Sequence, residues 1–559
     1  MNRFRNMTLI LVLLLITAGA LFGIRQMEYR MDNTINENKL RFTGAVSDAP
    51  PAVVFTTVAL GSFRGLLADV LWLRSEMLKG KKNYFEMVQL ARWITDLQPN
   101  YSAGTAYLAW NLAYNISVTS SNYEDRWYWV NEGINLIRDK AMLYNPDDPM
   151  IYRELSWIFL HKLGNLMDDA NLYYKNQMAV QMTNILGSTT PNWELLAAAP
   201  ANQEAFMKQF PEDSPFWEKV KKAGFRNYDE LFVAFRTPVK AKLPDTLRLY
   251  LTQEEMDALD AYFRAELLRN RLKLDPRRMI EIDRRYGKMD WRVPESQAIY
   301  WATVGVEKSL EKGKKPDLNC TRIISNGLQA AFKSGRILSL DDNYGNIQVV
   351  PNLNLADSAY EAFEQAEADF SESGAGMSFY SAKINYLKDA IPLIYIYGNV
   401  SKAQEFYNRL LEIDGSTRQK GRNLDEFVMV EYAEDVRDAD VKKASSVISG
   451  LIQRAFTYLI FNNREAAVSN ERLARYIHRI YSEKNKDIKR NTLPPYNQMK
   501  QGILDNFRKY APPALVTILE AEVNAEKAEE KQEQAPQEFW KQNNSSPFGT
   551  NLLKKETTM

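Results

Sequence analysis

Apolar residues recur at helical spacing over most of the chain from Gly61 onward. In Ser62–Leu78 they lie three and four positions apart, as on one face of an α-helix, and they include Phe63, Leu66, Leu67, Val70, Leu71 and Leu78. Two further helical patterns stop just before Pro99 and Pro146. Proline cannot continue a helix, so these prolines mark helix ends. The pattern predicts an all-α chain of helical hairpins.

The N-terminal pattern differs, because no charged residue occurs from Met7 to Ile24. As a helix these residues would extend about 27 Å, barely enough to cross a bilayer core. We favour a signal-anchor helix over residues 1–24, with the membrane crossed by residues 7–24. The alternative is a signal peptide cleaved at Ala18-Gly19-Ala20, which would leave a secreted or periplasmic protein. Arg3 and Arg5 place the N-terminus in the cytoplasm, so the bulk of a single-pass protein would lie outside it.

The rest of the chain divides by composition and pattern. We expect a linker at 25–60, helical repeats at 61–190, a divergent helical region at 191–290, a second helical region at 291–520, and a disordered polar tail at 521–559. Ser371–Ser378 contains two glycines and three serines, which is typical of a flexible joint. Thr252 and Glu255 have the spacing of a capping box at the start of a helix.

The hairpin residues resemble the tetratricopeptide repeat (TPR), a 34-residue helix-turn-helix with a proline after its second helix. The matching positions are Ala141 before Pro146, then Tyr152, Leu155, Ser156 and Phe159 after it, and Gly398, Ala403, Tyr407, Leu410 and Asp414 in a later hairpin. The resemblance implies a TPR-like α-solenoid, with stacked hairpins and a concave binding groove. Pro99 and Pro146 are 47 residues apart, 13 more than a standard unit, and we expect Ser117–Arg126 to hold the extra residues as a loop.

Two further stretches, Phe63–Arg74 and Met289–Ala302, resemble membrane-anchored bacterial TPR proteins. That resemblance implies a location at the bacterial inner membrane. It implies no activity.

Composition narrows the function. A net charge of +1 argues against nucleic-acid binding, which needs a basic surface. The single cysteine, Cys320, excludes an intramolecular disulfide and a cysteine-based zinc site, and two histidines leave little for a metal centre. No nucleotide-binding or hydrolase motif occurs. We therefore expect no enzyme activity, no cofactor, and no catalytic or metal-ligating residues.

The candidate binding residues are Trp110, Arg153, Trp157 and His161, which would face the groove in the TPR register. Most of the neighbouring positions expected in this groove are apolar or aromatic, which suits an apolar helix or an extended segment of a protein partner. A competing interpretation of the tryptophans between Trp72 and Trp157 is helix packing in the core. His161 alone is more typical of a structural histidine than of a ligand.

Two charged stretches have structural interpretations. Asp147 and Asp148 follow Pro146, where acidic residues favour the start of a helix. The arginines and lysine of 264–285 alternate with acidic residues, as on a solvated, salt-bridged face. The alternative for this basic run is contact with an anionic partner or a lipid headgroup.

The sequence thus predicts a membrane-tethered scaffold or assembly factor at the cell envelope, which binds protein partners through a TPR-like groove. The alternative is a helical enzyme or binding protein that acts on a cell-envelope glycan or lipid.

Overall fold

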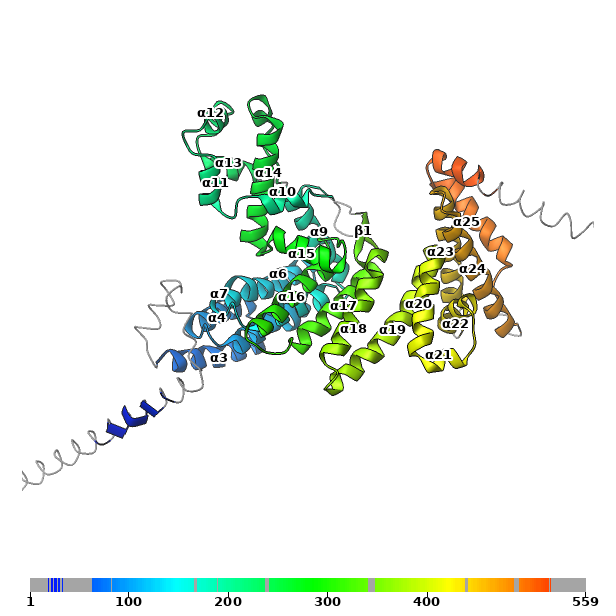
Figure 1. The fold of residues 1–559 in the computed structure, drawn as a ribbon, viewed down its shortest axis with the longest axis horizontal. Coiled ribbons are helices and arrows are strands. Elements are labelled where there is room, and N and C mark those ends of the chain that lie inside the picture. Colours follow the sequence, from blue (N-terminus) through cyan, green and yellow to red (C-terminus); the bar gives the residue numbers. More distant parts are fainter. Residues whose placement is uncertain are drawn as a thin grey trace, which may run out of the picture. The chain divides into compact units, whose positions relative to one another are not determined.

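The structure of the protein is a computed structural model. It describes residues 63–81, 83–164, 168–188, 190–236, 241–339, 347–437, 441–486, 492–521 and 523, with a few helical residues between 19 and 33. The described part is helical almost throughout (Figure 1). The all-α prediction is therefore confirmed. The expected membrane segment 7–24, the linker 25–60 and the tail 521–559 lie almost entirely outside the described residues. Within the described part, no helix combines the length and apolar character that a bilayer crossing requires.

The chain forms two compact units. The N-terminal unit comprises residues 1–279, 291–323 and 340–347, and the C-terminal unit comprises 280–290, 324–339 and 348–559. Each is described by itself.

The N-terminal unit is built from helices of very different lengths. Its first part contains α3 (Phe63–Lys81), α4 (Tyr84–Leu97), α5 (Ser102–Trp110), η1 (Asn111–Ile116), η2 (Ser117–Thr119), α6 (Tyr123–Asn135), η3 (Leu136–Ala141), α7 (Met142–Tyr144), α8 (Pro149–Trp157), η4 (Ile158–Leu163) and α9 (Asn171–Leu186). Its second part contains α10 (Trp193–Ala198), α11 (Gln203–Gln209), α12 (Pro215–Lys222), α13 (Tyr228–Phe235), η5 (Asp245–Leu249), α14 (Gln253–Leu267), η6 (Leu268–Leu272) and α16 (Pro294–Glu311). Residues of α15 (Pro276–Tyr286) and α17 (Leu318–Ser334) belong partly to each unit.

Four of these elements, η1, η3, η4 and η6, are π-helical turns that continue an α-helix. Their cause is visible in the buried positions. In α8 and η4 the buried residues recur at intervals of four, at Ile151, Leu155, Phe159 and Leu163. In a pure α-helix a four-residue stripe drifts by about 40° at each step. A wider π turn cancels part of this drift, so the stripe keeps facing the core.

The pair α5–η1 recurs as α8–η4 with every boundary displaced by 47 residues. Pro99 and Pro146 precede the two pairs by the same number of positions. They are confirmed as helix stops, because α4 and α7 end just before them. The expected loop at Ser117–Arg126 is wrong over most of its length. Ser117–Thr119 form η2, and α6 begins at Tyr123 because Asn122 accepts a capping hydrogen bond from the Asp125 N–H. Longer helices thus take up most of the extra residues.

α16 is the central helix of the N-terminal unit, and it packs against α8 and η4. Thirteen of its 18 residues are buried, so it is covered on all sides. At Gly305 a Cβ atom would lie 2.6 Å from Cys320 Sγ and 3.2 Å from Tyr152 Cβ. Glycine is therefore required where α16 meets α8 and the start of α17.

Cys320 should resist alkylation in the folded protein. Its side chain is fully buried, and burial raises the pKa of its thiol, with Asp317 adding to the effect. Since only the thiolate reacts, iodoacetamide should label the chain at the rate at which the N-terminal unit opens. Mass spectrometry of labelling against denaturant concentration measures this. Fast labelling under native conditions would contradict the packing around Gly305.

The C-terminal unit contains one antiparallel strand pair and a series of helices. The strands β1 (Arg336–Ser339) and β2 (Gln348–Val350) pair Arg336 with Val350, and a register irregularity follows Ile337. The helices are η7 (Leu353–Leu355), α18 (Ala356–Asp369), α19 (Gly374–Ile396), α20 (Val400–Ile413), α21 (Gly415–Gln419), α22 (Leu424–Arg437), α23 (Val441–Ile460), α24 (Arg464–Lys484) and α25 (Tyr496–Tyr510). α19 packs between α18 and α20, and α24 packs on α22 and α23.

The expected flexible joint at Ser371–Ser378 is wrong. Only its first three residues connect helices, because α19 begins at Gly374. Gly376 lies in the first turn of α19, where a Cβ atom would be 2.8 Å from the Phe370 carbonyl oxygen. This glycine therefore serves a close approach between the end of α18 and the start of α19, not flexibility.

Candidate functional sites

The structure brings together three of the four candidate binding residues. Trp110 ends α5 and Trp157 ends α8, each directly before a π turn, and His161 lies in η4. Trp110 and Trp157 each keep 38% of their surface exposed, so they are not simply core residues. The competing interpretation, helix packing in the core, holds for Trp129, which is 4% exposed.

The rings form a continuous chain across the two helices. Trp110 stacks on Tyr114 with centroids 5.4 Å apart, and Trp157 stacks on His161 at 4.7 Å with an interplanar angle of 13°. Tyr114 joins the pairs, because its hydroxyl lies 3.3 Å from His161 Nδ1. We call Trp110, Tyr114, Trp157 and His161 the ring surface. In each stack the partners are four residues apart, and the π turn brings such residues nearly above each other.

Arg153, the fourth candidate, lies one turn before Trp157 on α8. Its guanidinium forms an ion pair with Glu154 at 2.6 Å. Within the described residues, its guanidinium does not lie over any ring of the ring surface. Its charge is thus largely neutralised locally.

Tyr114 was missed by the sequence interpretation, although a signal existed. Tyr114 and His161 are separated by the same 47 residues that separate Trp110 from Trp157 and Pro99 from Pro146. An alignment of the two stretches at that offset would have placed the tyrosine beside the histidine. The 34-residue TPR register hides this correspondence.

The ring surface is electrically neutral near pH 7. Burial lowers the pKa of His161, and the neighbouring Lys162 lowers it further. Burial raises the pKa of Tyr114, with a contribution from Glu154. A protonated phenol beside a neutral imidazole lets the Tyr114 hydroxyl donate to Nδ1, which leaves the imidazole proton on Nε2. The surface therefore offers apolar ring faces and single polar atoms.

Two ion pairs are buried close to this segment. Lys162 Nζ lies 2.5 Å from Asp168 Oδ2 and 5.3 Å from the centre of the Tyr114 ring. Lys175 Nζ on α9 lies 3.1 Å from Glu295 Oε1 on α16, and their side chains are 5% and 1% exposed. The Lys162 pair fixes the residue that follows His161, so it holds η4 in place.

His161 should titrate below pH 6.5, the ordinary value of histidine. Because its pKa is lowered on folding, the unfolded chain binds more protons between the two pKa values. The free energy of unfolding should therefore fall as the pH drops through this window and be fully restored above it. NMR of the labelled imidazoles measures the midpoint, and His161→Gln assigns the signal, since the chain has two histidines. A midpoint at or above 6.5 would contradict the burial of the ring.

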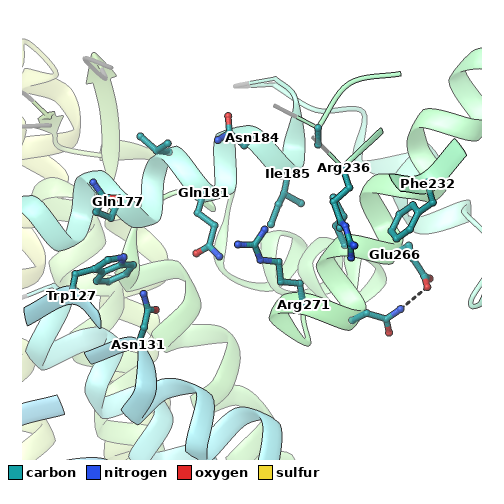
Figure 2. Close-up of a pocket in the computed structure, with 14 residues that line it drawn as sticks. Trp127, Asn131, Gln177, Gln181, Asn184, Ile185, Phe232, Arg236, Glu266 and Arg271 are labelled. Carbon is teal, nitrogen blue, oxygen red and sulfur yellow. Dashed lines mark hydrogen bonds between the residues drawn. The ribbon is translucent and has the colours of Figure 1, made fainter. Parts of the chain in front are cut away.

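A second feature is a cleft of about 820 Å³ in the N-terminal unit. α6 and α9 form one wall, and α13, α14 and η6 form the other (Figure 2). Half of the fourteen residues that line it carry side-chain amides or guanidinium groups, and six are apolar. The amides and arginines are Asn131, Gln177, Gln181, Asn184, Asn270, Arg236 and Arg271. Volumes of about 300–1,000 Å³ are usual for ligand sites.

Glu266 is the only carboxylate among the described residues that line this cleft. Burial raises its pKa, against the effects of Arg269 and of a hydrogen bond from Asn270. Beside this carboxylate, the described lining offers hydrogen-bonding amides and the charges of Arg236 and Arg271.

No group of three or more histidine, cysteine, aspartate or glutamate side chains in the described part of the chain is arranged to hold a metal ion.

Comparison with protein-family models found no match to the chain, and comparison with curated protein sequences found none. No activity can therefore be transferred from a relative.

Most of the basic run at 264–285 is exposed, as expected for a solvated face, including Arg271, Lys273, Arg277, Arg284 and Arg285. Arg264 and Arg269 are exceptions. The Arg264 side chain is 9% exposed, and its guanidinium donates to the Ile185 carbonyl at 2.8 Å and the Ala241 carbonyl at 3.1 Å. Arg269 donates to the Pro200 carbonyl at 2.6 Å. These arginines bind the ends of other helices to α14 and η6. They therefore help to hold the second wall of the cleft against α9.

Proposed function

We propose that the protein is a membrane-tethered scaffold or assembly factor that binds a protein partner through the ring surface. The observation that carries the proposal is the placement of four partly exposed rings at equivalent positions of two successive 47-residue units. Repeated units that present matching side chains are typical of solenoids, which bind other proteins along one face. The proposal includes that these repeated helical units form a TPR-like solenoid.

The chemistry of the ring surface suits a protein partner. Tryptophan and tyrosine dominate the residues whose truncation weakens protein interfaces most, because they bury a large area and lose little conformational freedom. Tyr114 and His161 add polar atoms that can orient a partner. The buried Lys162–Asp168 pair holds the segment before binding, which lowers the entropic cost of association.

The tether rests on the sequence of residues 7–24. We propose that these residues cross the bacterial inner membrane and leave the bulk of the chain outside the cytoplasm. Protease treatment of spheroplasts tests this orientation. We expect the bulk to be digested from outside, whereas protection of the bulk would reverse the topology. Release of the chain from washed membranes would favour signal-peptide cleavage instead.

The partner can be sought by crosslinking in membranes, followed by detergent extraction and pull-down of the full chain. Trp110→Ala and Trp157→Ala together should reduce recovery of the partner at least tenfold, as expected for truncation of central aromatic residues. Trp93→Ala is the matched control, because Trp93 is 54% exposed on α4 and outside the ring surface. Equal recovery with the ring variants, or no stable partner at all, would count against the proposal.

The second candidate is binding of a cell-envelope glycan or lipid. The parallel Trp157–His161 stack favours it, because exposed ring faces beside polar atoms also suit a sugar ring. Equilibrium binding of purified peptidoglycan fragments to the full chain tests it. Binding that is lost in Trp157→Ala, with no protein recovered in the pull-down, would replace the first proposal by the second.

A further inference from the structure

The amide-lined cleft has features of a second binding site. Three of its amides lie on one face of α9, at Gln177, Gln181 and Asn184. Figure 2 shows Gln181 and Arg271 extending into the space from opposite walls.

The spacing of Gln177 and Gln181 is close to the repeat of an extended peptide. Along a helix axis, Gln177 and Gln181 are separated by about 6 Å, and Asn184 follows about 4.5 Å further on. In an extended chain, equivalent peptide groups repeat every 6.6–6.8 Å, roughly two residues. A side-chain amide carries one carbonyl and one NH₂ group, so it can pair with both the N–H and the C=O of one residue of an extended chain, which point to the same side.

The charge of the cleft selects the side chains of such a peptide. Arg236 and Arg271 line it, and neither forms an ion pair with a carboxylate of the described residues; the guanidinium of Arg236 lies 5.6 Å from the centre of the Phe232 ring. The opposing carboxylate, Glu266, is engaged by Asn270. The cleft therefore carries an excess of positive charge, which favours acidic residues.

The cleft is held open by contacts between its walls. Arg264 on α14 donates to the Ile185 carbonyl near the C-terminal end of α9, and Trp127 on α6 stacks on Tyr174 of α9 at 5.9 Å. These contacts fix α9 relative to both α14 and α6. A site that is formed in advance loses less free energy on binding.

We propose that this cleft binds an extended, acidic peptide segment of a protein partner, with the amides of α9 pairing with its main chain and Arg236 and Arg271 contacting its carboxylates. The inference extends the proposed function, since it names a kind of partner, but it uses a site separate from the ring surface. A saccharide is the competing ligand class. The spacing of Gln177 and Gln181 along α9 and the excess arginine charge favour the peptide.

The test uses the purified full-length chain in detergent and a fluorescent twelve-residue peptide of alternating Asp and Ser, read by anisotropy. A generic probe suffices because main-chain pairing depends on charge and conformation, not on sequence. An alternating Lys-Ser peptide should bind at least tenfold more weakly. The Asp-Ser peptide N-methylated at every Asp, or at every Ser, removes the main-chain donors of one face. At least one of the two should lose about tenfold in affinity.

Variants then locate the site. Gln181→Ala with Asn184→Ala should weaken binding of the Asp-Ser peptide about tenfold. Arg271→Gln should weaken it and reduce its salt dependence. Gln209→Ala and Arg226→Gln are matched controls, because both residues are exposed outside the cleft. Unchanged protection of Cys320 against alkylation shows that each variant is folded.

Three results would overturn the inference. They are equal binding of the N-methylated peptides, equal binding by the cleft variants, and Gln181-dependent binding of a tetramer of N-acetylglucosamine without binding of the peptide. The last would make the cleft a saccharide site. Because the ring residues are intact in all cleft variants, these results are separate from the outcome of the pull-down.

Discussion

Replacing Glu295 with alanine should destabilise the N-terminal unit by about 3–5 kcal/mol, because it leaves the buried Lys175 ammonium without its partner. The two side chains are 5% and 1% exposed, so water cannot compensate the lost ion pair. Lys175→Met should destabilise the unit by a similar amount, since it leaves the Glu295 carboxylate buried without its partner. Gly164 lies close to the same carboxylate, because a Cβ there would be 3.2 Å from Glu295 Oε1. Disorder should therefore spread to the end of η4.

The double variant Lys175→Met with Glu295→Leu should be much closer to the wild type than either single variant. Glu295 Oε2 is buried without a hydrogen-bond partner among the described residues. The pair is therefore incompletely satisfied, and such pairs are often replaced by apolar residues at little cost. As a control, Glu204→Ala breaks an ion pair with Lys208 that is 74–75% exposed, and it should cost less than about 0.5 kcal/mol.

Alkylation of Cys320 reports on these variants. It lies in the same unit, so the denaturant midpoint of its protection measures this unit even if the C-terminal unit unfolds separately. A double variant as unstable as the single ones would show that the ion pair itself, rather than the stranded charge, determines stability.

Gly398→Ala should destabilise the C-terminal unit by about 2–4 kcal/mol, through two additive effects. Gly398 has φ +84°, a conformation that L-residues rarely adopt, in the turn between α19 and α20. A Cβ atom there would also lie 2.6–2.8 Å from the Cβ, Cα and N atoms of Ala466 on α24. Backbone atoms cannot move aside as a flexible side chain would, so α24 must shift.

Gly421→Ala separates the two effects. Gly421 also has a positive φ, +61°, but a Cβ atom there would meet nothing within 4 Å. It should cost only about 1 kcal/mol, the conformational part. Hydrogen exchange of α19, α20 and α24, followed by mass spectrometry, measures both variants. Equal protection in the two variants would mean that the contact with Ala466 is not close-packed.

Features set by local chemistry could be predicted from the sequence. Thr252 and Glu255 form the expected capping box, and Asp148 caps α8 by accepting from the Met150 N–H at 3.0 Å. α4 and α7 end two residues before Pro99 and Pro146. These outcomes depend on a few neighbouring residues, so they survive without knowledge of the rest of the fold.

Features set by contacts between residues far apart in the sequence could not be predicted. The glycines of Ser371–Ser378 are typical of flexibility, yet Gly376 is needed because a Cβ atom there would clash with the Phe370 carbonyl oxygen. Arg264 has acidic neighbours in sequence, yet its guanidinium also binds carbonyls of residues 185 and 241. The cleft joins residues of α6, α9, α13 and η6, which no local pattern connects. The TPR register identified Trp110, Trp157 and His161 but missed Tyr114, the ring that joins them.

The geometry of the ring surface depends on the number of residues in the π turns as well as on which residues carry the rings. A π turn accommodates one residue more than an α-helical turn. Deleting Leu160 should let η4 close into regular α-helix with Lys162 and Leu163 near their present places in the core, because the extra residue of the π turn is the one removed. Trp157 and His161 would then stand three positions apart instead of four, so the deletion should alter their parallel stack. Deleting Ser121, in the short connection outside both turns, should leave that stack unchanged.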